Sequence, residues 1–431
     1  MPDRDLGASV SAFLLGLRKR LPFFVAAARP RRIAMPCRIE NFDALQRATV
    51  EREELLARAC VDGALHQARP AETISVARAW HAELSHETPL APLPADLRKG
   101  GAYTADPVRF LRLDDLDVNA MWGVAVTRTG GIVEESRRAA DYRLGGVETL
   151  PGFARHGETL TYRSARAKHA PLVEGPCLHS GHRYCDVYGH WFSDLMTAVW
   201  IWREEIISGR LKLLVPAHTP AWGLAVLAKL GVMPAHCVVP RKRRIRLRRA
   251  ILGSSMGMGG IVRPPAVLRE LGGDLVRRIV PSGSAVERRL LYVTREGDVN
   301  HSIRQLANEG ELLARLLPLG FEVLRPGRLP FDEQVRLFAS ARLIVAPHGS
   351  ALMNLIFAPA GCGVVDLLPW TWASKATAPW AQRLAGILDH RYAVVMGEPC
   401  AAAEDGDTGR IIERCAVDVD AVLRAVQAFL A

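Results

Sequence analysis

The sequence predicts an α/β protein with two doubly wound halves that face a cleft, a small antiparallel element and an N-terminal extension. Three observations support this prediction: strand and helix patterns alternate from residue 186 onward, buried strands run into short polar loops, and apolar residues make up 49% of the 431 residues. Such alternation is typical of parallel sheets with right-handed crossovers. We expect a basic, partly irregular extension over residues 1–100, a first lobe over 101–284 and a second lobe over 285–431.

The extension mixes apolar and basic residues. Its apolar runs, 12–15 and 21–25, are separated by Arg18, Lys19 and Arg20. Neither run approaches the ~18 residues that span a bilayer, and a secretory signal needs a longer apolar core. We therefore expect a cytoplasmic protein, and the mixed pattern also suits contact with the inner face of the plasma membrane. Helix-forming residues further predict a helix within 43–68.

The first lobe begins with a small antiparallel element. Short apolar runs at 109–113 and 122–127 indicate strands, and Gly130-Gly131 is a hairpin turn signal. Downstream, the pattern predicts a helix over 191–207, a strand over 211–216, a helix over 221–230 and a strand over 238–240.

The second lobe alternates more clearly. Apolar runs predict strands over 289–293, 321–324, 342–346 and 363–368. Helical patterns lie between them over 309–317, 330–339 and 351–357, and Asp418 is expected to cap the C-terminal helix. Because these runs are almost continuously apolar, we expect strands buried on both faces of a parallel sheet.

The charge and cysteine content restrict the partners. A net charge of +11 suits an anionic partner such as a nucleotide diphosphate, nucleic acid or a lipid surface. The basic run 241–249 lacks interleaved aromatic residues for base stacking, so nucleic acid is not the expected partner. Cys177 and Cys185 lie near His179, His182 and His190, but the spacings fit no zinc pattern, so we expect no metal site.

The most informative segment is the loop His348-Gly349-Ser350, which joins an apolar strand to a helix. In open α/β sheets ligands bind at the carboxyl ends of strands, where a helix N-terminus offers free N–H groups to a phosphate. His348 and Ser350 can add hydrogen bonds. The alternative interpretation is a structural turn in which Ser350 caps the helix.

Three further residues belong with this loop. Arg295 follows the strand 289–293 directly, and a guanidinium there can neutralise a diphosphate through paired hydrogen bonds. Asn308 and Glu309 follow it along the chain. A surface arginine, and an asparagine that caps the helix beginning at Glu309, remain the simpler interpretations.

A separate pair is predicted in the first lobe. His190 and Asp194 are four residues apart, which places both on one face of a helix. Either side chain can accept a proton from a hydroxyl group. The alternatives are a half-buried histidine among aromatic residues and an aspartate that interacts with the helix dipole.

Taken together, these segments resemble glycosyltransferase family 61. The pieces that carry the resemblance occur in the order of that family's catalytic domain: 291–295, 308–309, 320–323, 333–341 and 347–357. Upstream, 189–194 resembles the family's Gly-His-aromatic segment. The resemblance covers about residues 105–430.

The resemblance implies a two-lobed, Rossmann-like fold of glycosyltransferase type B that inverts anomeric configuration without a metal or other cofactor. It implies that Arg295, His348, Gly349 and Ser350 hold the donor diphosphate and that Asn308 and Glu309 support that site. His190 or Asp194 would act as the base near the acceptor.

Two positions depart from the family pattern. Ser350 stands where the family usually has alanine, which is a change between small residues. Asp366 stands where type B enzymes commonly have a glutamate that binds the ribose, and its side chain is one methylene shorter. The resemblance nevertheless implies that Asp366 belongs to the donor site, at the position that binds the ribose.

The expected function is an inverting hexosyl or pentosyl transfer from a nucleotide-sugar to a saccharide or lipid-linked saccharide in bacterial surface or capsular polysaccharide synthesis. One alternative is an inactive member of the same fold that binds polysaccharide or acts as a scaffold. Another is a polyanion-binding protein that uses the run 241–249.

Overall fold

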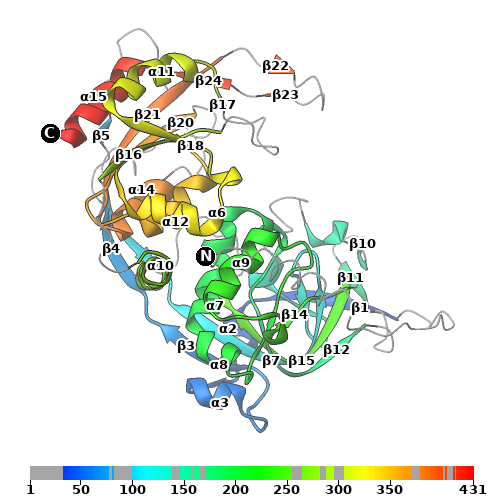
Figure 1. Cartoon of the computed structure of the whole chain (residues 1–431). Coiled ribbons are helices and arrows are strands. Elements are labelled where there is room, and N and C mark those ends of the chain that lie inside the picture. The colour runs from blue at the N-terminus through cyan, green and yellow to red at the C-terminus, as the bar shows by residue number, and fades with distance from the viewer. Residues whose placement is uncertain are drawn as a thin grey trace. The chain divides into compact units, whose positions relative to one another are not determined.

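The computed structural model describes residues 33–76, 80–81, 100–137, 146–150, 152–156, 159–164, 170–241, 243–254, 265–281, 288–295, 305–369, 379–400, 403–404, 411–412 and 414–431. The chain divides into two compact units (Figure 1). Unit 1 contains residues 1–71 and 106–259, and unit 2 contains residues 72–105 and 260–431. The chain is thus a mixed α/β protein in which each unit is built on a sheet with parallel strands.

Unit 1 contains a mixed sheet, and the segment with His179, His182 and His190 lies at and after the end of one of its parallel strands. Its parallel strands lie in the order β15 (Arg244–Gly253), β12 (Leu172–His179), β13 (Lys212–Leu214) and β14 (Cys237–Val238). β7 (Val108–Asn119) pairs antiparallel with β15. The sheet continues through β8 (Ala125–Val126), β9 (Gly131–Val133), β1 (Ile33–Glu40), β11 (Thr159–Ser164) and β10 (Phe153–His156).

The helices of unit 1 connect its parallel strands. Between β12 and β13 the chain forms α6 (Tyr188–His190), η3 (Trp191–Met196), α7 (Thr197–Ile201) and α8 (Arg203–Ile207). α9 (Ala221–Lys229) connects β13 to β14. The predicted helices at 191–207 and 221–230 are confirmed, except that η3 is a π-helix. The predicted hairpin signal is also confirmed, because β8 and β9 pair antiparallel.

The helix predicted within 43–68 is confirmed, but only as short helices. The segment forms two short helices, α2 (Phe42–Leu45) and α3 (Arg52–Leu56), and then β3 (Ala64–Arg69). α3 ends at Ala57, whose backbone N–H donates to the Glu54 carbonyl, and Gly63 adopts a left-handed φ of +81° in the turn before β3. Pairing of β3 with β7 then overrides helix propensity, and it buries Leu65 in the core of unit 1.

The basic run 241–249 lies mostly in β15, in the interior of the sheet. Ile245, Leu247 and Ala250 are buried. Three of its arginines form ion pairs with acids of β7, Arg244 with Asp117 and both Arg246 and Arg248 with Asp115. Part of the positive charge that the sequence suggested for a polyanion is therefore balanced within the sheet.

Unit 2 contains a sheet whose parallel strands lie in the order β18 (Phe321–Leu324), β16 (Arg289–Val293), β19 (Ala341–Pro347), β20 (Gly363–Pro369) and β21 (Arg391–Pro399). β24 (Arg414–Val417) and β17 (Gln305–Leu306) extend it beyond β21. Along the chain β16 comes first and β18 second, so the direction of strand addition reverses between β16 and β19. Ligands bind at such reversal points in open α/β sheets.

Helices cover both faces of this sheet (Figure 1). α11 (Glu309–Leu316) and α15 (Val419–Leu430) share one apolar core with the strands. The other face carries α10 (Pro265–Ile279), α12 (Phe331–Ala339), η8 (Ser350–Phe357) and α14 (Trp380–Ile387). A Cβ at Gly272 of α10 would lie 2.1 Å from the carbonyl oxygen of Ile356 in η8, so α10 and η8 pack in close contact. Asp418 caps α15, as predicted.

The two units differ from the division expected from the sequence. Residues 33–40 form β1 within the sheet of unit 1, although they were assigned to an extension. β4 (Glu72–Val76) pairs with β6 (Gly101–Ala105), and β5 (Trp80–His81) pairs with β21 of unit 2. The apolar runs 12–15 and 21–25 lie outside the described residues. Within the described ranges, no helix is both long enough and apolar enough to cross a bilayer.

Candidate active site

The first candidate site lies at the carboxyl end of β12 in unit 1. The segment after β12 contains His182 and a short 3-10 helix, η2 (Arg183–Asp186), and it leads into α6 and η3. β12 pairs in parallel with both β13 and β15, so this end of the strand is a common position for ligand sites. His182, His190 and Asp194 meet there.

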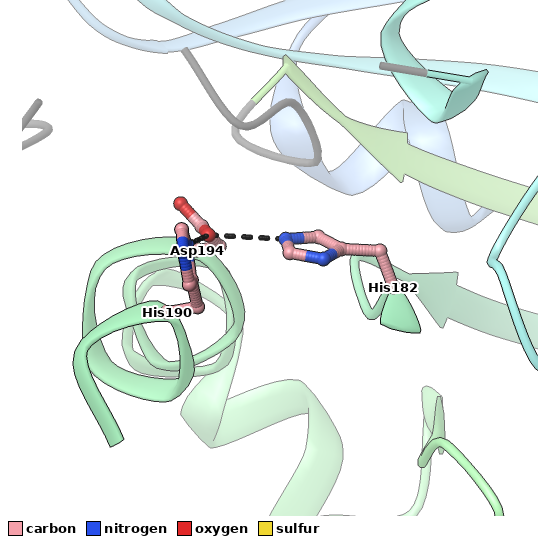
Figure 2. Close-up of side chains that lie close together, drawn as sticks. All are labelled: His182, His190 and Asp194. Atoms are coloured by element: carbon pink, nitrogen blue, oxygen red, sulfur yellow. Dashed lines mark hydrogen bonds and ion pairs between the residues drawn. The ribbon is translucent and has the colours of Figure 1, made fainter. Parts of the chain in front are cut away.

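One carboxylate oxygen holds both histidines (Figure 2). Asp194 Oδ2 accepts hydrogen bonds from His182 Nε2 at 3.0 Å and from His190 Nδ1 at 2.9 Å. The hydroxyl of Ser193 donates to the other oxygen, Oδ1, at 3.1 Å. The spacing of four residues therefore brings His190 and Asp194 together as predicted, and His182 joins them from the preceding loop.

The hydrogen bonds assign the tautomers of both histidines. The backbone N–H of Tyr184 donates to His182 Nδ1 at 3.2 Å, so a neutral His182 carries its proton on Nε2 and donates it to Asp194. His190 donates through Nδ1, which leaves its Nε2 as the basic nitrogen. His182 is fully buried, whereas the His190 side chain is 29% exposed and its ring lies 5.5 Å from that of Tyr184.

The surroundings keep Asp194 ionised. Burial of this carboxyl opposes ionisation, but hydrogen bonds from His182 and His190 and their charges outweigh burial and lower the pKa of Asp194 well below its usual value. An ionised Asp194 is the natural acceptor for two N–H donors and the natural partner for a histidine that gains a proton. Of the two predicted bases, His190 is therefore better placed than Asp194, whose Oδ2 already accepts two bonds.

A close backbone contact supports the loop that carries His182. Gly123 adopts φ +78°, and a Cβ there would lie 2.4 Å from the Gly181 carbonyl oxygen. His179 donates from Nε2 to the Gly123 carbonyl at 2.8 Å. Burial lowers the pKa of His179 to about 4, so this histidine is neutral near pH 7. These contacts fix the position of the loop before His182.

The same three side chains have the composition of a metal site. Their ligand atoms lie within 4.8 Å of one another. Their hydrogen bonds do not match metal coordination, because His182 Nδ1 accepts the Tyr184 N–H and Nε2 must then carry the proton. Coordination through Nε2 would require either loss of that bond or an imidazolate. The arrangement fits a hydrogen-bonded triad of two histidines and a carboxylate better than a cation site.

The second candidate site lies in unit 2, where the loops after β16 and β19 meet. Arg295 follows β16, His348 follows β19, and Arg295 Nη1 donates to the His348 carbonyl at 3.4 Å. Arg295 is 7% exposed. The structure therefore brings these two predicted residues together at the point where strand order reverses.

The ring of His348 is held within the protein. Its Nδ1 donates to Asp366 Oδ2 at 2.8 Å, and the indole N–H of Trp380 donates to its Nε2 at 2.9 Å. The hydroxyl of Tyr392 also donates to Asp366 Oδ2, at 2.6 Å. Both His348 and Asp366 are fully buried.

This network corrects the roles expected for His348 and Asp366. Both ring nitrogens of His348 have partners, so the ring supports the loop instead of offering a hydrogen bond to a phosphate. The Asp366 carboxylate lies inside β20 and accepts two bonds, so it is not presented to a ribose in this conformation. A ligand at this loop would meet its backbone and Ser350.

The remaining predicted residues of unit 2 stabilise the strand ends. Glu309 Oε1 accepts hydrogen bonds from the hydroxyls of Tyr292 and Thr294, at 2.8 and 2.6 Å. Asn308 bonds through both ends of its amide to the backbone of Val417. Asn308 therefore does not cap α11 through its side chain. Glu309 thus holds the end of β16, and Asn308 connects the start of α11 to β24, while their support of a donor site stays a prediction.

The loop residues Gly349 and Ser350 have simple geometry. Gly349 is extended, with φ 166°, and it is the N-cap residue of η8. Ser350 is the first residue of η8 and is half-buried, so it is not the N-cap. The alternative in which Ser350 caps the helix is therefore wrong.

Comparison with known families identifies the segment that contains both candidate sites. Residues 188–365 match the family Glycosyltransferase 61. None of the curated proteins compared with this chain matches it. The Glycosyltransferase 61 match contains His190, Asp194, Arg295 and the loop 348–350, and it ends one residue before Asp366.

Several contributing residues were not predicted. His182 precedes the Glycosyltransferase 61 segment and was noted only within a cysteine–histidine cluster. Trp380 and Tyr392 are far from His348 in sequence and carry no local motif. Of these three residues, only His182 could have been found from the sequence, because it lies in the loop that follows a buried parallel strand, where ligand sites occur.

Proposed function

We propose that the protein is an inverting glycosyltransferase that moves a hexosyl or pentosyl group from a nucleotide-sugar to a saccharide or lipid-linked saccharide acceptor. The observation that carries the proposal is that one Glycosyltransferase 61 segment contains both the His190–Asp194 pair and the Arg295–His348 loops. The process we propose is the synthesis of bacterial surface or capsular polysaccharide at the cytoplasmic face of the membrane.

In the proposed reaction His190 is the base. Its Nε2 accepts the proton of an acceptor hydroxyl, and the hydroxyl oxygen forms a bond to the anomeric carbon of the donor. The bond between that carbon and the diphosphate oxygen breaks, and its electron pair leaves with the diphosphate. Attack opposite to the leaving group inverts the anomeric configuration. Asp194 stabilises the protonated His190 through the bond at Nδ1.

The leaving group accumulates negative charge, and Arg295 is the cation proposed to stabilise it. Backbone N–H groups at the start of η8 and the Ser350 hydroxyl would bind the same diphosphate. Because a guanidinium and N–H dipoles supply this stabilisation, the proposed mechanism uses no metal. We take unit 1 as the acceptor lobe and unit 2 as the donor lobe of a type B glycosyltransferase.

A thermal-shift titration tests the donor site. Purified protein is titrated with UDP, GDP, CDP and their sugar forms, with and without EDTA. A ligand at 100 times its dissociation constant should raise the unfolding free energy by about 2.7 kcal/mol. We expect stabilisation by one nucleotide class, unaffected by EDTA and lost in Arg295→Ala.

Arg277→Ala is the matched control, because the Arg277 side chain is 72% exposed on α10 of the same unit. Arg295→Lys adds a finer comparison, since it keeps the charge but loses the planar donor pair. If no nucleotide stabilises the wild type, the donor site is wrong. The inactive polysaccharide-binding member of the fold then becomes the better interpretation.

A further inference from the structure

His182 occupies a position that the proposed reaction does not require as a base. It is fully buried, it precedes the Glycosyltransferase 61 segment, and it points at the same carboxylate oxygen as His190 (Figure 2). A buried histidine costs less when both ring nitrogens have partners, and here both do. Because His182 and His190 share Asp194 Oδ2, the position of His182 affects both other side chains.

We infer that His182 is a positioning residue whose fixed Nε2–H aims Asp194 at Nδ1 of His190, so that His190 presents its basic Nε2 to the acceptor. This inference rests on the proposed glycosyltransferase function. His182 is the permanent hydrogen-bond donor, Asp194 is the carboxylate that both histidines share, and His190 is the base.

The Tyr184 backbone makes the first role permanent. Its N–H occupies the lone pair of His182 Nδ1 at 3.2 Å, and a backbone amide cannot reverse its direction as a side chain can. Neutral His182 must therefore keep its proton on Nε2 and donate it to Asp194. His182 cannot exchange this proton with the acceptor without breaking that bond.

The shared carboxylate then controls His190. Asp194 Oδ2 accepts both N–H groups, and Ser193 holds Oδ1, so rotation of the carboxylate about its Cβ–Cγ bond would break three bonds. With rotation prevented, the acceptor for His190 Nδ1–H stays in place. The tautomer of His190 that has a free lone pair on Nε2 is the one that this acceptor selects.

The loop before His182 is built to hold its position. Gly181 contacts Gly123 at a distance that excludes any side chain, and His179 bonds to the Gly123 carbonyl. The other ionisable groups near His182 include His179 on β12, His218, which bonds to the Arg183 carbonyl, and three groups on η2: Tyr184, whose ring lies 6.2 Å from that of His182, Cys185 and Asp186. Burial raises the pKa of the Cys185 thiol, so this group stays neutral.

Two substitutions separate positioning from simple packing. His182→Gln retains an N–H donor near the position of Nε2, whereas His182→Leu removes the donor but keeps an apolar side chain of moderate size. His156→Gln is the matched control, because His156 lies exposed at the end of β10 in the same unit.

The first readout is the histidine tautomer, measured on the full-length protein by long-range ¹H–¹⁵N correlation NMR. We expect wild type to show Nε2–H for His182 and Nδ1–H for His190. His182→Gln should retain the His190 tautomer, and His182→Leu should give a mixture of both forms. This measurement needs no substrate, so it stays informative if the glycosyltransferase proposal fails.

The second readout is kinetic. We expect His182→Leu to lower kcat by about 10- to 100-fold with little change in KM for the nucleotide-sugar, since misplacement of a base by about 1 Å has effects of this order. His182→Gln should recover most of the loss, and His156→Gln should match wild type.

Three results would overturn the inference: His182 in the Nδ1–H form, an unchanged His190 tautomer in a folded His182→Leu protein, or equal kcat losses in the Gln and Leu variants. Displacement of the His182 signals by added Zn²⁺ at stoichiometric concentration would instead identify a metal site. Absence of transfer by wild type, with the expected tautomers, would reject the proposed function alone.

Discussion

Replacement of Asp194 by asparagine tests the catalytic pair most directly. The amide has the same shape as the carboxylate, and its oxygen can accept from His182 and His190 while its NH2 group points at the Ser193 hydroxyl, which can reverse and accept. The substitution therefore removes the negative charge with little change in packing. What remains at His190 Nδ1 is a neutral hydrogen bond.

The lost charge sets the size of the effect. His190 Nδ1 and Asp194 Oδ2 are 2.9 Å apart. For charge centres about 4 Å apart and an effective dielectric constant of about 20, the attraction between imidazolium and carboxylate is about 4 kcal/mol. If roughly half of the proton has moved in the transition state, about 2 kcal/mol is lost, which corresponds to a decrease in kcat of about 30-fold.

The assay is single-turnover transfer with saturating donor, so that product release does not mask the chemical step. Ser193→Ala is the comparison variant, because it removes the bond to Oδ1 but keeps the negative charge, so it should lower the rate by less than Asp194→Asn does. A rate for Asp194→Asn within about threefold of wild type would refute the assignment of charge stabilisation to Asp194. Full activity in His190→Ala would refute the base itself.

Three further predictions concern stability. Tyr392→Phe removes a hydroxyl that donates to the buried Asp366 carboxylate at 2.6 Å, so urea unfolding should give a free energy lower by about 1.5–3 kcal/mol; a decrease below about 0.5 kcal/mol would contradict the network. Gly123→Ala places a Cβ 2.4 Å from the Gly181 carbonyl oxygen at a left-handed φ, so we expect urea unfolding to give a free energy lower by more than about 1 kcal/mol. Gly209 also has a left-handed φ but has open space around it, so Gly209→Ala should lower the unfolding free energy only by the cost of the strained backbone conformation. The pKa of Asp194 is lowered in the folded protein, so its contribution to stability is fully present above the unfolded value of about 3.9 and is lost as the pH falls through the lower folded value. Thermal melts should therefore show a steeper decrease below about pH 4 for wild type than for Asp194→Asn, and parallel curves would argue against the two histidine bonds.

The strands of unit 2 were predictable because their physical signal is local. β19 and β20 are buried along nearly their whole length and β16 over its last three residues, so each leaves a nearly continuous apolar run in the sequence; β18 lies at the edge of the sheet and includes the exposed Glu322. The reversal of strand order between β16 and β19 follows from pairing over long distances. No local pattern contains that information.

The side-chain network at His348 could not be predicted for the same reason. His348 is 18 residues from Asp366 and 32 from Trp380, and Tyr392 is 26 residues from Asp366. Polar residues near a strand end suggest contacts with a ligand. Only the fold reveals that the hydrogen-bonding groups of His348 and Asp366 are occupied by Trp380 and Tyr392. His190 and Asp194 were predictable as a pair because four residues on a helix bring side chains together without any tertiary information.

The π-helix η3 has a consequence for how the proposed His190–Asp194 pair tolerates change. A π-turn holds one residue more than an α-turn, so it has the geometry of a single residue inserted into an otherwise regular helix. Trp191, Phe192, Asp194, Leu195 and Met196 are all buried in this segment, so a change in its length would disturb a packed environment. Deletion of one residue here would restore an ordinary α-turn and leave the register of the following helix α7 unchanged. The residues of the wide turn itself would shift, so the cost of the deletion would fall on the position of Asp194 relative to the two histidines.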